Sequence, residues 1–162
     1  MTVYLCGFMG CGKSTVGKLL AKNLGQRFTD MDAYIVQCER MSIPDIFSFR
    51  GEEYFRDRET AAIEQLGLQG GVIACGGGAM LREENAALAA HHGRTVFIDV
   101  PFETCYERIK NDSNRPLVVN NTRASLEELF NKRRVIYLKN TAVHIAGTGS
   151  PMEIAKRIAA DI

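Results

Sequence analysis

The chain has 162 residues, of which 46% are hydrophobic and 24% charged, and its formal net charge is +1. These proportions are typical of globular proteins, so a disordered or collagen-like chain is excluded, and the length suits one domain. The near-neutral charge speaks against a nucleic-acid partner. No run of about 18 apolar residues is present, so we expect no membrane-spanning helix and no membrane partner.

The five cysteines form no CxxC pair and are scattered along the chain. This pattern predicts reduced thiols in a cytoplasmic protein. The first residues run directly into a glycine-rich loop, without a basic segment, an apolar segment and a cleavage site, so we expect no signal peptide.

Short apolar runs alternate with amphipathic segments along the whole chain. The predicted strands are 3–6, 27–30, 72–75, 95–99 and 142–145. The predicted helices are 14–24, about 33–39, one starting near Ser42, 52–66, 82–91, 102–110, about 125–138 and one opening at Ser150. We interpret Ser125 with Glu128, and Ser150 with Glu153, as capping boxes. The alternation predicts a three-layer α/β/α fold with a five-stranded parallel sheet, whose ligands bind at the carboxyl ends of the strands.

The segment 111–123 lacks periodicity and is rich in Asn, Ser and Pro. Long irregular loops in compact domains are usually functional. We therefore predict a mobile loop there, and Arg115 within it could close over a phosphate.

The strongest motif is GFMGCGKS at residues 7–14, which fits G-x-x-x-x-G-K-[ST] between a predicted strand and a predicted helix. Its glycines let backbone amides wrap phosphates at a helix N-terminus. Lys13 would reach the β- and γ-phosphates, and the Ser14 hydroxyl would bind Mg²⁺. The motif predicts a nucleoside triphosphate site without defining the acceptor.

Two places offer a carboxylate for the metal. Asp99 follows the apolar run 96–98 and could either serve the metal or cap the next helix. Asp30 and Asp32 end the second strand, and in an extended chain both would point to one side. One of them could then hold Mg²⁺ while the other contacts an acceptor hydroxyl.

Arg56 and Glu59 are three residues apart on a predicted helix and share a face. An arginine held by a glutamate can clamp a carboxylate or phosphate, although a plain surface pair has the same spacing. The run 76–78 is Gly-Gly-Gly after a strand, which suits either close approach to a ligand or a flexible turn. Either Arg133 or Arg134 could face the same site.

Taken together, these motifs resemble the shikimate kinase family over nearly the whole chain. The resemblance rests on the phosphate loop followed in order by D-M-D at 30–32, F-R-x-x-E at 55–59, Gly-Gly-Gly at 76–78, R-P-L at 115–117 and R-x-x-x-Y at 133–137. It implies a P-loop kinase fold related to the nucleoside monophosphate kinases. The chain would be a single domain, 1–162, with a substrate-binding segment at about 32–60 and a mobile lid at about 111–123.

The resemblance also implies residue roles. The residues implied to bind ATP are Gly10, Cys11, Gly12, Lys13, Ser14, Thr15, Arg108, Arg115 and Pro151. Those implied to bind the acceptor are Asp32, Phe47, Phe55, Arg56, Glu59, Gly77, Gly78 and Arg133. Lys13, Asp32 and Arg115 would be catalytic, and Ser14 with Asp30 would hold Mg²⁺.

The implied reaction is ATP-dependent phosphorylation of the 3-hydroxyl of shikimate, within aromatic amino-acid biosynthesis, by a monomer. Two alternatives stay open. One is a related kinase acting on gluconate or a nucleoside monophosphate. The other is a nucleotide-binding switch that has no acceptor.

Overall fold

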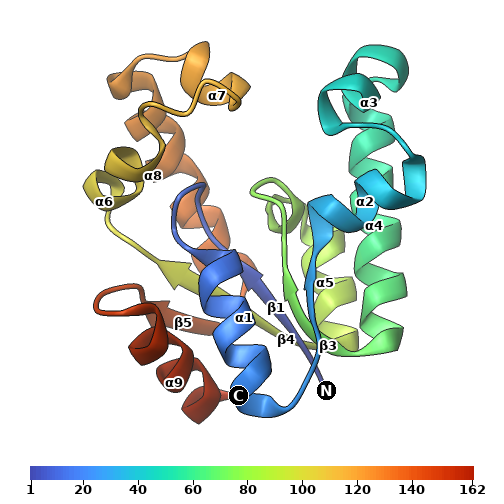
Figure 1. Ribbon diagram of the computed structural model, residues 1–162, viewed down its shortest axis with the longest axis vertical. Coiled ribbons are helices and arrows are strands. Elements are labelled where there is room, and N and C mark those ends of the chain that lie inside the picture. Colours follow the sequence, from blue (N-terminus) through green and yellow to red (C-terminus); the bar gives the residue numbers. More distant parts are fainter.

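Five parallel strands form one sheet in the order β2-β3-β1-β4-β5 (Figure 1). The computed structural model describes residues 1–162. The strands are β1 (Thr2–Cys6), β2 (Phe28–Asp30), β3 (Gly71–Ala74), β4 (Gly93–Asp99) and β5 (Val143–Ala146). All five predicted strands are confirmed, each within two residues at either end.

Nine α-helices and one 3₁₀ helix connect and cover the strands. They are α1 (Lys13–Leu24), α2 (Met31–Glu39), α3 (Ile43–Arg50), α4 (Glu52–Gln69), η1 (Ala79–Leu81), α5 (Glu83–His92), α6 (Phe102–Ile109), α7 (Pro116–Val119), α8 (Arg123–Asn140) and α9 (Pro151–Asp161). The predicted helices are confirmed, with α7 as an addition inside the segment expected to be irregular.

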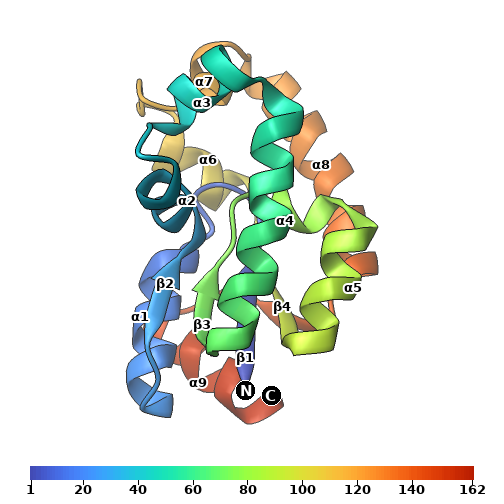
Figure 2. The same ribbon diagram turned by 90° about the vertical axis from the view of Figure 1, so that its right-hand side faces the viewer.

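The central strand shows why the sheet is covered on both faces. Val3 and Leu5 belong to a core cluster with residues of α1 and α9. Tyr4 and Cys6 point the other way, into a second cluster with residues of α4 and α5. Alternate side chains leave opposite faces of a strand, so a strand that is buried along its whole length requires two helical layers. The predicted three-layer α/β/α architecture is therefore confirmed (Figure 2).

Two arms extend beyond the carboxyl ends of the strands (Figure 1). One arm consists of α2, α3 and the first turns of α4, and the other consists of α6, α7 and the first half of α8. After β1 the chain builds β2 and β3 on one side of it, then β4 and β5 on the other. Ligands of open parallel sheets bind at such a reversal, so the region between the arms is the expected site.

The start of α8 corrects one expectation. The capping box is formed by Thr122 and Ser125, because Thr122 accepts the Ser125 amide and Ser125 accepts the Thr122 amide. Ser125 thus takes the third position of the helix, and pairing it with Glu128 was wrong. The capping box of α9 is confirmed, since Ser150 and Glu153 exchange the same two hydrogen bonds at 2.9 and 3.2 Å.

Part of the segment 111–123 forms a short helix, α7, where the sequence predicts irregular structure. Arg115 is extended at the N-cap of α7, and Pro116 fills the first helical position. Proline is favoured there because its fixed φ suits a helix and its missing amide loses no bond.

All five cysteines are free, and only Cys38 is exposed. No helix combines the length and the apolar composition needed to cross a bilayer.

Candidate active site

The loop 7–14 joins the carboxyl end of β1 to the first turn of α1. Gly10 and Gly12 have φ values of 81° and 89°, a left-handed conformation that strains any other residue. Gly12 caps α1, whose first turn contains no acidic side chain. The free amides and the positive end of α1 therefore face outward together, as an anion site requires.

Lys13 extends back along this loop. Its Nζ donates to the carbonyl oxygens of Gly7 at 2.7 Å and Phe8 at 3.3 Å. The ammonium group is thereby held over the loop, where it adds positive charge beside the amides.

A cavity of about 470 Å³ opens above the loop. It is lined by Met9, Gly10, Gly12, Lys13, Ser14, Thr15, Asp30, Asp32, Ala74, Cys75, Gly76, Gly77, Arg108, Ile109, Arg115 and Pro151. Every residue predicted to bind ATP is among them except Cys11. The Cys11 side chain is 1% exposed, and its amide donates to the Phe8 carbonyl at 3.1 Å, so it lies beneath the loop.

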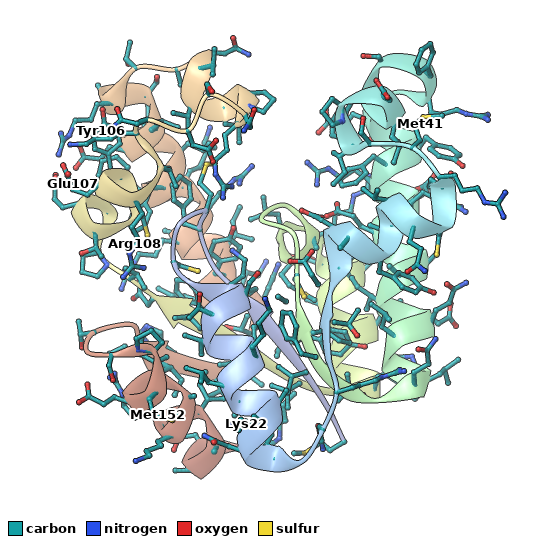
Figure 3. All side chains as sticks on the ribbon, in the orientation of Figure 1. Lys22, Met41, Tyr106, Glu107, Arg108 and Met152 are labelled. Atoms are coloured by element: carbon teal, nitrogen blue, oxygen red, sulfur yellow. The ribbon has the colours of Figure 1, made fainter.

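Arg108 and Pro151 come to this cavity from different helices. Arg108 lies near the end of α6, in the arm opposite to the one that contains Met41 (Figure 3). The Arg108 guanidinium donates to the Gly10 carbonyl at 2.9 Å. Pro151 is the first residue of α9. Both side chains border the cavity, and both are among the residues that the family resemblance implies for ATP binding.

Ser14 and Asp30 form the oxygen-rich side of the cavity. The Ser14 hydroxyl donates to Asp30 Oδ2 at 3.2 Å, and Asp30 Oδ1 accepts the Ala33 amide as the N-cap of α2. The chain therefore turns into a helix at Met31 and is not extended through Asp32 as expected. Two oxygen ligands this close fit Mg²⁺, which uses one or two protein oxygens and completes its shell with phosphate and water.

Asp99 has neither of the roles considered for it. Its carboxylate accepts three hydrogen bonds of 3.0, 3.1 and 2.6 Å from Arg134 and lies 2.9 Å from His144 Nε2. It does not line the cavity, and Pro101 occupies the N-cap of α6 without a side-chain cap. Asp99 thus ties β4 to α8 and β5, a contact that no local motif could reveal.

Asp32 lies on the first turn of α2 and reaches the cavity. Its Oδ1 is buried without a hydrogen-bond partner. Burial, reinforced by the charge of Asp30, raises the pKa of the Asp32 carboxyl, while Lys13 and two arginines oppose the shift. A carboxylate in this state accepts a proton more readily than one in water.

Arg56 and Glu59 form the predicted pair on α4. Their Nη1 and Oε1 atoms are 2.6 Å apart, and the Glu59 side chain is 1% exposed. Burial acts to lower the pKa of Arg56, but Glu59 and Glu52 outweigh it and raise that pKa, so the guanidinium stays charged. The surface-pair interpretation is therefore wrong for these residues, because a buried glutamate fixes the arginine in place.

The triple glycine after β3 lets two guanidinium groups approach the backbone. A Cβ on Gly78 would lie 2.8 Å from the guanidinium carbon of Arg56. A Cβ on Gly77 would lie 3.3 Å from Arg133 Nη1. None of the three glycines has a positive φ, so the missing side chain matters here and not backbone freedom.

Gly76 serves the acidic groups in the same way. A Cβ there would lie 2.8 Å from Asp32 Oδ1 and 3.0 Å from Glu59 Oε2. Both oxygens are buried and lack a hydrogen-bond partner. Two carboxylates and two guanidinium groups therefore lie beside the three glycines of this turn, next to the cavity.

An apolar surface adjoins Arg56. Phe55 is 5% exposed and Phe47 is 37% exposed, and their ring centroids are 5.0 Å apart. The Arg56 guanidinium lies 5.4 Å from the Phe55 ring centre. The two rings therefore form an apolar wall beside the charged groups.

Arg115 lines the cavity from the start of α7. Its Nε donates to Asp112 Oδ2 at 2.8 Å. The sequence reasoning missed Asp112, although its i, i+3 spacing from Arg115 is the same signal that paired Arg56 with Glu59.

Comparison with known proteins agrees with this geometry. The family model described as shikimate kinase matches residues 9–162. A shikimate kinase of Persephonella marina is 46% identical over 158 residues, covering 96% of this chain and 95% of that protein. The solved structure of a shikimate kinase from Acinetobacter baumannii in complex with shikimate is 35% identical, with a TM-score of 0.89 over 98% of this chain and 90% of that one. A gluconokinase from Sinorhizobium meliloti, 17% identical with a TM-score of 0.59 over 98% of this chain and 89% of that one, shares the fold alone.

The parallel sheet, the phosphate loop and the flanking arms define a P-loop kinase. Within that class, the matched family model and the relatives covering nearly all of both chains decide the family. The chain belongs to the shikimate kinase family.

Proposed function

We propose that this protein transfers the γ-phosphoryl group of ATP to the 3-hydroxyl of shikimate, giving shikimate 3-phosphate and ADP for aromatic amino-acid biosynthesis. The observation that carries the proposal is the turn 76–78, where Asp32, Arg56 and Arg133 converge beside the phosphate loop. Two guanidinium groups next to an acidic group suit an acceptor that bears both a carboxylate and hydroxyls.

ATP would lie along the cavity with its phosphates on the loop. The backbone from Gly10 to Thr15 would bind the β- and γ-phosphates, and Lys13 would leave its present carbonyl partners to neutralise them. Arg108 and Pro151 would enclose the adenine. Cys11 would contribute through its backbone alone, because its side chain is buried.

Ser14 and Asp30 would hold Mg²⁺ beside those phosphates. When bound, the ion neutralises charge on the phosphate oxygens during transfer.

The acceptor would be bound by its carboxylate and its ring. Arg56, fixed by Glu59, and Arg133 would form the carboxylate clamp. The backbone of Gly77 and Gly78 would approach the ring, and Phe47 and Phe55 would cover an apolar face.

Asp32 would orient the attacking hydroxyl and accept its proton as the phosphoryl group moves. Its buried, unpartnered Oδ1 is available for that hydroxyl. Phosphoryl transfer depends more on alignment and charge stabilisation than on a strong base, so the carboxylate needs only a modestly raised pKa.

The segment 111–123 would act as a lid that brings Arg115 to the transferred phosphoryl group and excludes water. Arg115 already faces the cavity, held there by Asp112. Amide hydrogen exchange in 111–123 should slow when ADP and shikimate bind together, and equal exchange with and without them would contradict a closing lid.

We also propose a single-domain, monomeric, cytoplasmic enzyme. Free cysteines suit a reducing compartment, and ATP is abundant there. Light scattering on a size-exclusion column would test the monomer, and a dimer mass at micromolar concentration would contradict it.

A coupled ADP-release assay with ATP and Mg²⁺ tests the reaction, comparing shikimate, gluconate, AMP and no acceptor. Turnover with shikimate alone is expected. Turnover only with gluconate or AMP would overturn the acceptor, and slow ADP release without any acceptor would favour the nucleotide switch.

The same assay with Arg56→Ala tests the clamp. Losing charged hydrogen bonds should raise the KM for shikimate about 100-fold while the KM for ATP changes less than about twofold. Arg58→Ala is the matched control, because Arg58 lies on the same helix but stacks on Tyr54. Equal losses for both substrates would contradict the clamp.

A further inference from the structure

Tyr137 is the last residue of the R-x-x-x-Y motif, and the proposed chemistry gives it no role. It lies on α8 four residues after Arg133, so both side chains emerge from one face of the helix. The Tyr137 side chain is 1% exposed. Its hydroxyl donates to the Gly77 carbonyl at 2.5 Å, sixty residues away in the sequence.

The carbonyls that follow Gly77 are held in the same manner. Asn85 Nδ2 on α5, completely buried, donates to the Ala79 carbonyl at 2.9 Å. Asn140 Nδ2, near the end of α8, donates to the Met80 carbonyl at 2.9 Å. Side chains from α5 and α8 therefore hold three backbone carbonyls in the stretch from Gly77 to Met80.

This turn separates the two guanidinium groups of the proposed clamp. The Arg56 guanidinium, from α4, lies beside the Cα of Gly78, and the Arg133 guanidinium, from α8, lies beside the Cα of Gly77. A shift of the turn would move both groups relative to each other. The spacing of the clamp therefore depends on how firmly the turn is held.

Thr60 extends the network to the first arm. Its hydroxyl lies 3.2 Å from the Arg56 carbonyl and 2.7 Å from Asn85 Oδ1. The backbone that carries Arg56 is thus linked through Asn85 to the turn, while Tyr137 links the turn to the helix that carries Arg133.

We propose that Tyr137 is a positioning residue for acceptor binding, whose hydrogen bond to the Gly77 carbonyl sets the turn between Arg56 and Arg133. Asn85 and Asn140 hold the carbonyls of Ala79 and Met80, which directly follow the turn. This inference rests on the proposed shikimate kinase activity and adds a residue that acts through the clamp without touching the substrate.

Burial strongly raises the pKa of the Tyr137 hydroxyl, so the group remains a donor throughout the neutral pH range. Tyr137→Phe removes this donor and keeps the ring, which packs 5.2 Å from Phe97. The variant therefore removes the hydroxyl, with its hydrogen bond to the Gly77 carbonyl and its contact with Arg133, while the packing of the ring is preserved.

Tyr4→Phe is a matched control. Tyr4 is completely buried in the same core cluster, and its hydroxyl donates to a backbone carbonyl, that of Ile63, at 2.8 Å. Both variants lose one buried tyrosine hydrogen bond, so their losses of thermal stability should be similar. Of the two tyrosines, only Tyr137 contacts the turn 76–78 beside the clamp.

The experiment measures KM and kcat in the ADP-release assay, with the shikimate Kd determined by isothermal titration calorimetry. Tyr137→Phe should raise the KM and Kd for shikimate about fivefold, the loss typical of one hydrogen bond, and leave the KM for ATP unchanged. Tyr4→Phe should change none of these constants. Asn140→Ala, at a half-buried position, should raise the KM for shikimate about twofold and provides a second reading if Tyr137→Phe folds poorly.

The outcomes separate the two proposals. An unchanged shikimate KM in Tyr137→Phe, or an equal rise in Tyr4→Phe, would overturn the positioning role while the kinase activity stands. An equal rise in the KM for ATP would also overturn it, because the effect would then be general. A wild-type protein without turnover on shikimate would contradict the proposed function itself.

Discussion

Two glycine-rich turns follow neighbouring strands of this sheet and use glycine for different physical reasons. In the phosphate loop, Gly10 and Gly12 have left-handed backbones, so glycine is required by conformation. In the turn 76–78 no glycine has a positive φ, and glycine is required because charged side chains pack on the Cα atoms.

This difference explains why the binding groups of one site are close together in the sequence and those of the other are not. The phosphate loop contains nearly all of its binding groups within eight residues, because backbone amides do the binding. The turn 76–78 supplies a surface, and its binding groups come from α2, α4 and α8. The first site is therefore a contiguous motif, whereas the second exists only in the folded chain.

The largest effect should come from the phosphate loop. Lys13→Met removes the ammonium group that would neutralise the transferred phosphoryl group, and kcat should fall about 1,000-fold or more. Circular dichroism should show an intact fold, because the Nζ binds only atoms of the loop itself in the free protein, namely two carbonyl oxygens and the Cys11 sulfur. Residual kcat within tenfold of the wild type would place the phosphates elsewhere.

The next test separates the two uses of glycine. Gly78→Ala should displace the Arg56 guanidinium and raise the KM for shikimate about 10- to 100-fold, with little change in the KM for ATP. Gly77→Ala should have a smaller effect, because its Cβ would meet the flexible end of Arg133 at 3.3 Å. The comparison fails if Gly77→Ala is the more damaging variant, or if either raises both KM values equally.

A smaller effect concerns stability. Burial raises the pKa of Asp32, so its charge destabilises the folded protein wherever the group is ionised. Asp32→Asn should therefore abolish most activity yet raise the Tm by about 2–4 °C at pH 7, equivalent to roughly 1 kcal/mol.

The pH dependence identifies the cause. Below the unfolded-state pKa of about 4, Asp32 is protonated in both states and the Tm difference should vanish. It should reappear as the pH rises through the higher folded-state pKa. A variant that is less stable than the wild type at neutral pH would mean that the cations around Asp32 outweigh its burial.

Much of this site could be predicted because the sequence patterns that reveal it involve residues close together in the chain. The phosphate loop, the Arg56–Glu59 spacing and the strand–helix alternation all depend on residues close in sequence. The residues alone left Arg133 and Arg134 as alternatives for this site, and only the family resemblance favoured Arg133, which approaches Gly77 from far along the chain. The Tyr137 hydrogen bond and the Asp99–Arg134 pair could not be predicted, because each joins elements that meet only through the sheet order.

Two ion pairs formed by residues of α8 allow a buried pair to be compared with an exposed one. Arg134 binds Asp99, whose side chain is 12% exposed, whereas Lys139 binds Glu83, and both members of that pair are about 70% exposed. Burial acts to raise the pKa of Asp99, but hydrogen bonds from Arg134 and His144 outweigh it and hold the pKa below its usual value. The stabilisation from Asp99 is therefore present above about pH 4 and is lost as the pH falls through the lowered folded-state pKa.

Asp99→Asn should consequently lower the Tm by about 2–4 °C at pH 7, or roughly 1 kcal/mol once solvent screening of Arg134 is allowed for. The loss should shrink toward pH 3, where the wild-type carboxylate is itself being protonated. Glu83→Gln on the exposed pair should leave the Tm unchanged within error, because solvent screens both of its charges. Differential scanning calorimetry of the two variants decides whether burial or the mere presence of an ion pair stabilises α8, and equal losses would refute the role given to burial.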